Sequence, residues 1–394
     1  MVFVHLAASA CVGGPESQIL GLVGAWPGRS VVLSFAEGGR CQALLDAAAA
    51  RGAEVVALQS NAPHYRQAVR EVAGHLKRLD ASVVCCHGYK PDILGLFAAL
   101  RVGIPALSVA HGWTAATWKV RVNETLDRLC MRGMDRVVCV SEAQAKKVRS
   151  AGISARRAVV ISNAIDPEPF LDSDPTARAE LNALFPAVPP RLIVGSVGRL
   201  SPEKGFGVLV EAAAEVARER PDVGFVHLGD GPLRPVLQER VNTLGLAERF
   251  RFAGFRADVA RLFPHFDLFT LPSYTEGLPC VVLEAFAAGV AVVATAVGGT
   301  PEIVVDRVGD PDENGCLVPP GDAAALARSL VALLDDPEAR RRLAANGRRR
   351  VLELFTFHRQ AEAYRAMLAD VSAERERGRS DSGPMPAHAS SLRG

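Results

Sequence analysis

Two segments of the sequence place charged side chains beside glycines at the ends of apolar runs. In the first, GSVGRLSPEKGF, Arg199 and Lys204 follow the apolar run 192–197 and precede a helical pattern. Two cations, together with the backbone amides at the start of a helix, suit the charge of a diphosphate. The plain alternative is a surface arginine and lysine at a helix start, and the second segment counts against it.

The second segment carries two carboxylates. In PSYTEGLPCVVLEAF, Glu276 lies in a loop that contains glycine, and Glu284 lies eight residues later in a helix predicted to open near Pro279. Carboxylates accept hydrogen bonds from sugar hydroxyls, and a ribose offers two adjacent ones. The amides of Gly277 and Leu278 stand at the positive end of that helix. Because the neighbours of Glu284 are apolar, its carboxylate is expected to have a partner or a function.

The first half adds glycines, a histidine and an indole. Gly13 and Gly14 follow the first apolar run, where glycine lets the backbone approach a phosphate closely, although a plain strand-to-helix turn has the same pattern. His111 and Trp113 follow the run 104–109, so the imidazole faces the expected cleft and the indole could stack on a sugar. The alternative for His111 is a capping or core histidine.

Weaker candidates end other predicted elements. His87 ends a strand in CCHGYKPD and is followed by Tyr89 and Lys90. These side chains are either contacts for an acceptor or ordinary strand-end residues, and the sequence leaves both open. Glu302 and Asp322 stand at predicted helix starts, where capping is the expected role.

The apolar pattern predicts an α/β fold of two Rossmann-like, doubly wound lobes. Strands buried on both faces and separated by helices form parallel sheets. Predicted strands lie at 2–7, 31–35, 54–58, 82–86, 104–109, 136–140 and 158–161, and then at 192–197, 223–228, 249–252, 266–271, 291–295 and 316–318. Two such lobes face each other across a cleft at the carboxyl ends of their strands, where ligands bind in these folds.

The chain is expected to divide into five parts. Residues 1–165 and 191–355 form the two lobes, and the proline-rich stretch 166–190 connects them. Residues 356–372 form a helix predicted to pack back toward the first lobe. Residues 373–394 are polar and are predicted to form a disordered tail.

Composition excludes several classes of protein. The eight cysteines show no CxxC spacing and are expected to be reduced core residues of a cytoplasmic protein. No apolar run reaches the roughly 18 residues that a membrane span needs, and the N-terminal stretch lacks the basic residues of a signal peptide.

Residues 1–170 hold 19 Lys and Arg against 13 Asp and Glu, an excess that either favours peripheral contact with an anionic membrane or is ordinary surface charge. No carboxylate pair is placed to hold a metal at a diphosphate, so chemistry without a metal or cofactor is expected.

Several motifs, taken in order, resemble glycosyltransferase family 4, the retaining GT-B enzymes. EGLPCVVLE resembles the Glu-x7-Glu motif of that family, and GRLSPEKG resembles its phosphate-binding loop. VSEAQ, ISNAID, HLGDGP, GGTPEIV and NGCLVPPGD also agree, so the resemblance covers nearly the whole chain.

The resemblance implies that the candidate residues surround a nucleotide-sugar donor. In this resemblance, Arg199 and Lys204 bind the diphosphate, Glu284 binds the ribose, and the backbone near Phe255 and Arg256 contacts the base. Glu276 binds the transferred sugar, His111 lies beside that sugar, and the amides of Gly277 and Leu278 bind sugar and phosphate. Gly13 and Gly14 face the donor.

The expected function is transfer of a sugar from a UDP-, GDP- or ADP-sugar to a saccharide or lipid-linked acceptor, with retention of configuration, in polysaccharide or glycoconjugate assembly. The alternatives are a nucleotide-sugar epimerase of the same fold and a non-catalytic nucleotide-sugar-binding module. The presence of Lys204, Glu276 and His111 counts against the module. The expected location is the cytoplasm or the inner face of the membrane, with no nucleic-acid partner.

Overall fold

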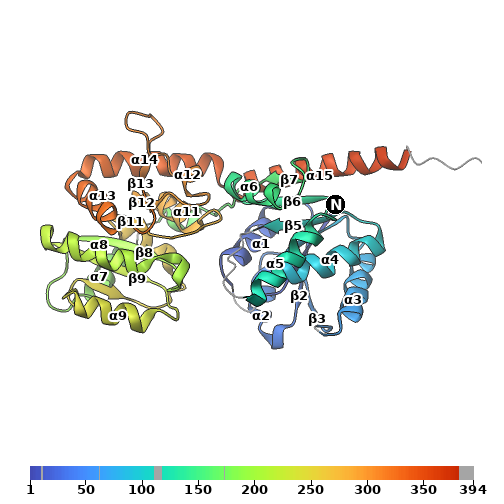
Figure 1. Cartoon of the computed structure of the whole chain (residues 1–394), viewed down its shortest axis with the longest axis horizontal. Helices are drawn as coiled ribbons and strands as arrows, with labels where there is room; N and C mark the ends of the chain where they lie inside the picture. The colour runs from blue at the N-terminus through green and yellow to red at the C-terminus, as the bar shows by residue number, and fades with distance from the viewer. Residues whose placement is uncertain (10–11, 62, 111–117, 173, 381–394) are drawn as a thin grey trace, which may run out of the picture.

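The chain forms two lobes that stand side by side (Figure 1), each built on a sheet of parallel strands. The computed structural model describes residues 1–9, 12–61, 63–110, 118–172 and 174–380. His111 and Trp113, singled out above, lie outside these ranges.

The first lobe is built on a seven-stranded sheet with the order β3-β2-β1-β4-β5-β6-β7. The strands are β1 Val2–Ala7, β2 Arg29–Phe35, β3 Glu54–Leu58, β4 Val83–His87, β5 Ala106–Ala110, β6 Arg136–Cys139 and β7 Ala158–Val160. The helices between them are α1 Gly14–Ala25, α2 Gln42–Ala49, α3 Tyr65–Arg78, α4 Tyr89–Val102, α5 Trp118–Met131 and α6 Glu142–Ser150. The central strands are buried on both faces, because helices cover both sides of the sheet.

The second lobe repeats this plan on a six-stranded sheet with the order β10-β9-β8-β11-β12-β13. Its strands are β8 Leu192–Val197, β9 Val223–Leu228, β10 Phe250–Phe252, β11 Leu268–Leu271, β12 Val292–Thr295 and β13 Gly315–Val318. Its helices are α7 Pro175–Ala183, α8 Phe206–Glu219, α9 Arg234–Thr243, α10 Val259–Leu262, α11 Cys280–Ala287, α12 Thr300–Ile303, α13 Ala323–Asp335 and α14 Pro337–Leu354. The last helix, α15 Phe357–Ser380, runs back along the first lobe (Figure 1).

The strand order reverses once in each sheet, between β1 and β4 and between β8 and β11. Loops that leave neighbouring strands at such a reversal diverge to opposite faces of the sheet, and the crevice between them is where doubly wound proteins bind ligands. The loop after β8 carries Arg199 and Lys204, and the loop after β11 carries Glu276. The fold therefore brings the two charged segments of the sequence to one crevice.

The predicted α/β architecture is confirmed, since all thirteen predicted strands are present with ends within two residues of the prediction. The pattern does not predict α5 or α7. Helix α7 lies inside the proline-rich stretch 166–190, and it forms there because Pro175 opens it and the Asp174 carboxylate caps the amide of Thr176.

The prediction of a disordered tail over residues 373–394 is wrong for residues 373–380, which continue α15. Their polar side chains find partners on the first lobe. Glu374 accepts hydrogen bonds from both Arg136 and Arg156, and the Arg375 guanidinium donates to Asp135. Ion pairs with a folded surface thus order a segment whose composition alone would leave it disordered.

Candidate active site

The loop after β8 brings a lysine to a carboxylate of the loop after β11. Lys204 ends the short 3₁₀ turn Pro202–Lys204, and its Nζ lies 2.7 Å from Glu276 Oε1. Arg199 is exposed on the same loop, and its guanidinium makes no ion pair or side-chain hydrogen bond with any described residue. One cation is therefore held in place and the other is open to a ligand.

Glu276 is held on two sides. Its side chain is only 8% exposed, and the same Oε1 that pairs with Lys204 also accepts a 2.6 Å hydrogen bond from Ser273 Oγ. Ser273 is fully buried two residues after the end of β11, and sequence reasoning missed it. Two donors on one carboxylate oxygen hold the carboxylate in a fixed orientation.

Glycines let the loops around Glu276 pack backbone against backbone. Gly298 has a φ of +54°, and a Cβ atom there would lie 1.9 Å from the carbonyl oxygen of Glu276. Gly229 has a φ of +144°, and a Cβ atom there would lie 1.9 Å from the carbonyl oxygen of Gly198. Only glycine fits such conformations at such short separations.

A buried histidine supports the loop after β8, and sequence reasoning missed it as well. His227 on β9 is inaccessible to solvent, with Ser196 Oγ 2.9 Å from Nδ1 and the carbonyl oxygen of Gly198 3.1 Å from Nε2. A carbonyl can only accept, so Nε2 carries the proton and Nδ1 accepts from Ser196. Burial lowers the pKa of His227 to about 4, so the ring is neutral and this pairing holds at physiological pH. The signal was present in the motif HLGDGP, as a histidine inside an apolar strand.

The loop before α11 presents backbone amides. The carbonyl of Gly277 accepts from the amide of Gly299, and the carbonyl of Leu278 accepts from Asn163 Nδ2. The amides of Gly277 and Leu278 donate to no acceptor among the described residues. Free amides beside a helix N-terminus attract anionic groups.

Glu284 faces a cavity between the lobes. The cavity has a volume of about 730 Å³ and is lined by α1, the crossover near Asp166, α11 and the start of α15. Ligand sites commonly have volumes of roughly 300 to 1,000 Å³. Gly14, predicted from the sequence to face the donor, lies in the wall of the same cavity, and its role toward a donor stays a prediction. Gly13 precedes it, and its amide donates to the Glu16 carboxylate.

The Glu284 carboxylate has no hydrogen-bond partner among the described residues. Burial raises its pKa to about 7. The Glu284 side chain is half-buried, and a carboxylate without a partner that faces a cavity is a group that a ligand with hydroxyl donors can satisfy.

Phe255 and Arg256 follow β10 in the position predicted for base contact. The Phe255 ring is 78% exposed and free to meet a ligand. The Arg256 guanidinium is instead tied to Asp258 and Glu180, and these carboxylates raise its pKa. Its side chain therefore anchors the loop, which leaves only its backbone for a base.

His87 and Lys90 line a cavity of about 740 Å³ in the first lobe. Lys90 pairs with Glu37, donates to Asn61, and lies 4.2 Å from the centre of the Phe35 ring. The lysine charge is thus neutralised in place. The cavity places these two predicted acceptor contacts in one wall, together with Tyr89.

The lobes are joined by hydrogen bonds that the sequence did not reveal. Gln18 of α1 donates to the carbonyl of Ala164 and to Cys280 Sγ, so it connects the first lobe, the crossover and α11. Asp322 caps α13 as predicted. Glu302 also acts as a cap, but for α6 of the other lobe, where its carboxylate accepts from the amides of Glu142 and Ala143.

Two Rossmann-like lobes, with cations and a carboxylate at one crevice and a cavity between the lobes, have the architecture of the GT-B class of proteins. Residues 184–350 match the family described as Glycosyl transferases group 1, and residues 12–169 match the one described as Glycosyltransferase Family 4. The chain belongs to this family, the group 1 glycosyl transferases of glycosyltransferase family 4. The epimerase and the binding module are not favoured by this membership.

Individual relatives agree with this assignment. The lipopolysaccharide core biosynthesis glycosyltransferase LpsE of Rhizobium meliloti is 32% identical over 281 residues, which cover 71% of this chain and 76% of LpsE. Alpha-D-kanosaminyltransferase of Streptomyces kanamyceticus is 37% identical over 180 residues, which are 45% of each chain. The crystal structure of Anabaena HepE in complex with UDP has a TM-score of 0.81 at 24% identity and covers 94% of this chain and 100% of HepE, a likeness of fold.

Proposed function

We propose that the enzyme transfers a sugar from a nucleotide-sugar to a saccharide or lipid-linked acceptor with retention of configuration. The observation that carries this proposal is the convergence of Arg199, Lys204 and the free amides of Gly277 and Leu278 at the β8–β11 crevice, beside the buried carboxylate of Glu276. HepE has been crystallised with UDP and with UDP-glucose, which supports a nucleotide-sugar donor here.

In the proposed reaction, Arg199 and Lys204 neutralise the diphosphate as it leaves. Negative charge grows on the phosphate oxygens when the bond to the sugar breaks, and fixed cations and amides stabilise that charge without a metal ion. Glu276 accepts hydrogen bonds from hydroxyls of the transferred sugar. Lys204 contacts both Glu276 and the phosphates. The acceptor hydroxyl attacks from the face of the departing phosphate, whose oxygen takes the proton, and His111 is proposed to contact the sugar.

The acceptor is proposed to occupy the cavity beside His87 and Lys90. Its polar groups are the ion pair of Lys90 and Glu37, an amide, tyrosine hydroxyls and the His87 imidazole. Such walls suit a polyhydroxylated, saccharide-like acceptor whose hydroxyls both donate and accept. LpsE, a lipopolysaccharide core biosynthesis enzyme, supports a saccharide acceptor.

A donor panel tests the proposed function. We expect one of UDP, GDP and ADP to raise the melting temperature, and the matching nucleotide-sugar to be hydrolysed slowly. Anomeric proton couplings of the donor and of the transfer product then give the stereochemistry, and an α-linked donor should yield an α-linked product. A β-linked product would overturn the mechanism, and the absence of any nucleotide response would overturn the function.

The shifted pKa of Glu284 predicts that donor binding depends on pH. A ribose favours the ionised carboxylate, so binding must release the proton that Glu284 holds below its pKa of about 7. Affinity for the nucleotide-sugar should therefore rise about tenfold between pH 6 and pH 8. Isothermal titration at several pH values measures this, and Glu284→Gln should bind more weakly with a flat profile. A wild-type affinity that is equally flat would contradict the ribose assignment.

The raised pKa of Glu284 has the opposite effect on the stability of the fold, which should fall as the pH rises. Its folded pKa lies above the ordinary value of 4.5, so the folded state binds the proton more tightly than the unfolded chain. The stabilisation is fully present below pH 4.5 and is lost as the pH rises through 7.

Peripheral membrane contact is proposed through α4 and α5. Phe97 and Leu100 of α4 and Leu126 and Leu129 of α5 are exposed, and the two helices pack against each other. Among the described helices, none is long and apolar enough to cross a membrane. An apolar surface on the more basic half of the chain suits an anionic bilayer.

Vesicle flotation tests this contact. We expect binding to anionic vesicles, loss of binding at high salt, and at least a tenfold loss in the double variant Phe97→Ser/Leu100→Ser, because apolar area on the surface is removed. Leu352→Ser, an exposed leucine of the second lobe, is the matched control. Equal binding by both variants, or attachment that yields only to detergent, would contradict the proposal.

A further inference from the structure

The switch point of the first sheet carries three side chains with metal-binding atoms. His5 of β1 pairs across the strands with Cys85 of β4, and Ala7 pairs with His87. Side chains alternate along a strand, so His5, Cys85 and His87 all lie on the same face of the sheet. His5 and Cys85 are fully buried, and His87 is partly exposed at the strand end.

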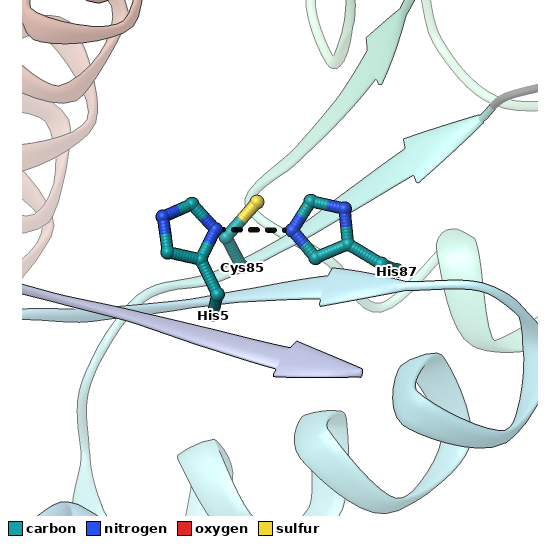
Figure 2. Close-up of side chains that lie close together, drawn as sticks. All are labelled: His5, Cys85 and His87. Carbon is teal, nitrogen blue, oxygen red and sulfur yellow. Dashed lines mark hydrogen bonds between the residues drawn. The ribbon is translucent and has the colours of Figure 1, made fainter. Parts of the chain in front are cut away.

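The three side chains converge on one point. His5 Nδ1 and His87 Nε2 are 3.1 Å apart, and both nitrogens and the sulfur of Cys85 lie within 4.8 Å of one another. Figure 2 shows the two imidazole rings turned toward each other, with the sulfur beside the line that joins them. Two imidazoles on a tetrahedral Zn²⁺, with Zn–N bonds of about 2.0 to 2.1 Å, have nitrogens about 3.3 Å apart. The nitrogens of this cluster would need to separate by only a few tenths of an ångström.

The donor set is selective. Thiolate and imidazole ligands prefer Zn²⁺ and related transition metals over Mg²⁺ and Ca²⁺, which take oxygen ligands. A small cavity of about 10 Å³ borders His87 and is also lined by Gln18, Asn163 and Tyr364. That volume is about the size of one water molecule. A water held there would lie beside His87, one of the three proposed ligands.

We propose that His5, Cys85 and His87 form a binding site for Zn²⁺ or a similar soft transition metal at the β1–β4 switch point of the first lobe. The metal bonds to His5 Nδ1, His87 Nε2 and the Cys85 thiolate, and the thiol proton passes to solvent. Binding ties β1 to β4 and fixes His87 in the wall of the acceptor cavity. The competing arrangement is a histidine pair joined by one hydrogen bond, with the thiol uninvolved.

The surroundings of the site indicate how strongly it binds. With the metal on Nδ1, the proton of His5 lies on Nε2, and that atom is buried without a hydrogen-bond partner among the described residues. Metal-bound histidines usually donate this proton to an acceptor, and loss of such a partner weakens affinity about 10- to 100-fold. The site is therefore expected to bind Zn²⁺ reversibly and to be emptied by EDTA.

The site is separate from the proposed donor chemistry. Arg199, Lys204 and Glu276 belong to the second lobe and need no metal, so the EDTA-treated enzyme should still respond to its nucleotide and transfer sugar. A chelated enzyme that loses transfer and regains it with Mg²⁺ or Mn²⁺ would contradict the proposed stabilisation of the leaving diphosphate without a metal ion. It would say nothing against the cluster in the first lobe.

Metal titration of the full-length, EDTA-treated protein tests the proposal. We expect one Zn²⁺ per chain by isothermal titration, a rise in melting temperature, and a thiolate-to-cobalt charge-transfer band when Co²⁺ is used. The Cys85→Ser variant should lose the stoichiometric Zn²⁺ binding, the rise in melting temperature and the cobalt charge-transfer band. Cys86→Ser is the matched control, because Cys86 is equally buried on the same strand but faces the opposite side, against Gly95.

Other results would overturn the site. These are wild-type protein that takes up no stoichiometric Zn²⁺, or equal metal binding by Cys85→Ser and Cys86→Ser. If Cys85→Ser does not fold, His87→Gln replaces it, since this position is at a strand end and keeps every cysteine. Loss of the cobalt band in His87→Gln supports the site, and an unchanged band overturns it.

Discussion

Lys204→Ala and Arg199→Ala are each expected to lower kcat/KM by about 30- to 700-fold, which corresponds to roughly 2 to 4 kcal/mol of transition-state stabilisation. The reason is that charge develops on the departing diphosphate, and these side chains are the cations placed at the β8–β11 crevice. Lys204 already lies 2.7 Å from Glu276, so its position is set before the donor arrives. Steady-state kinetics with the nucleotide-sugar found in the donor panel measures the loss.

A stability effect must be separated from this kinetic one. Lys204→Ala leaves the Glu276 carboxylate with Ser273 as its remaining partner, so some loss of melting temperature is expected. Arg240→Ala is the control, since Arg240 forms an exposed ion pair with Glu211 in the same lobe and should leave turnover unchanged. Near-wild-type turnover in both Lys204→Ala and Arg199→Ala would remove the phosphate assignment.

Gly298→Ala is expected to lower kcat/KM by about 100-fold, although it alters no charged group. A Cβ atom at this position would lie 1.9 Å from the carbonyl oxygen of Glu276, and neither backbone has a flexible end that can move aside. Relieving the overlap to ordinary contact needs a shift of about 1 Å, and misplacement of this size costs about two orders of magnitude in rate. Kinetics with the donor, together with thermal melting, measures the effect.

Gly245→Ala is the matched control for the backbone conformation. Gly245 has a φ of +72°, and an added Cβ atom there would meet nothing within 4 Å. Both variants force alanine into the left-handed region, which costs about 1 to 2 kcal/mol of stability, but only Gly298→Ala displaces the Glu276 loop. Equal kinetics in the two variants would show that the close approach of Gly298 to Glu276 does not position the site.

The positions of the strands and of the charged loops could be predicted from the sequence. Strands of a parallel sheet are buried on both faces and read as continuous apolar runs, so 192–197 and 223–228 stand out without any structure. Residues at the carboxyl ends of such strands must face the crevice. This is why Lys204 and Glu276 could be assigned to one site although 72 residues separate them.

Local composition was a poor guide wherever distant partners decide the outcome. The polar segment 373–380 was expected to be disordered, yet ion pairs of Glu374 and Arg375 with the first lobe order it as the end of α15. The sequence assigns the backbone near Arg256 to the base, and only the fold shows that Asp258 and Glu180 hold the guanidinium of this residue.

The sequence by itself determined the two-lobed α/β architecture, the family, and the candidates for the phosphate loop, because periodicity and short motifs are local properties of the chain. The tertiary structure alone decided which side chains meet across the lobes and across the sheets. Gln18 and Glu302 join the lobes, His227 supports the loop after β8, and His5 converges with His87. Each is a single polar residue in an otherwise ordinary pattern, and its role depends on partners brought close only by strand order and crossover connections.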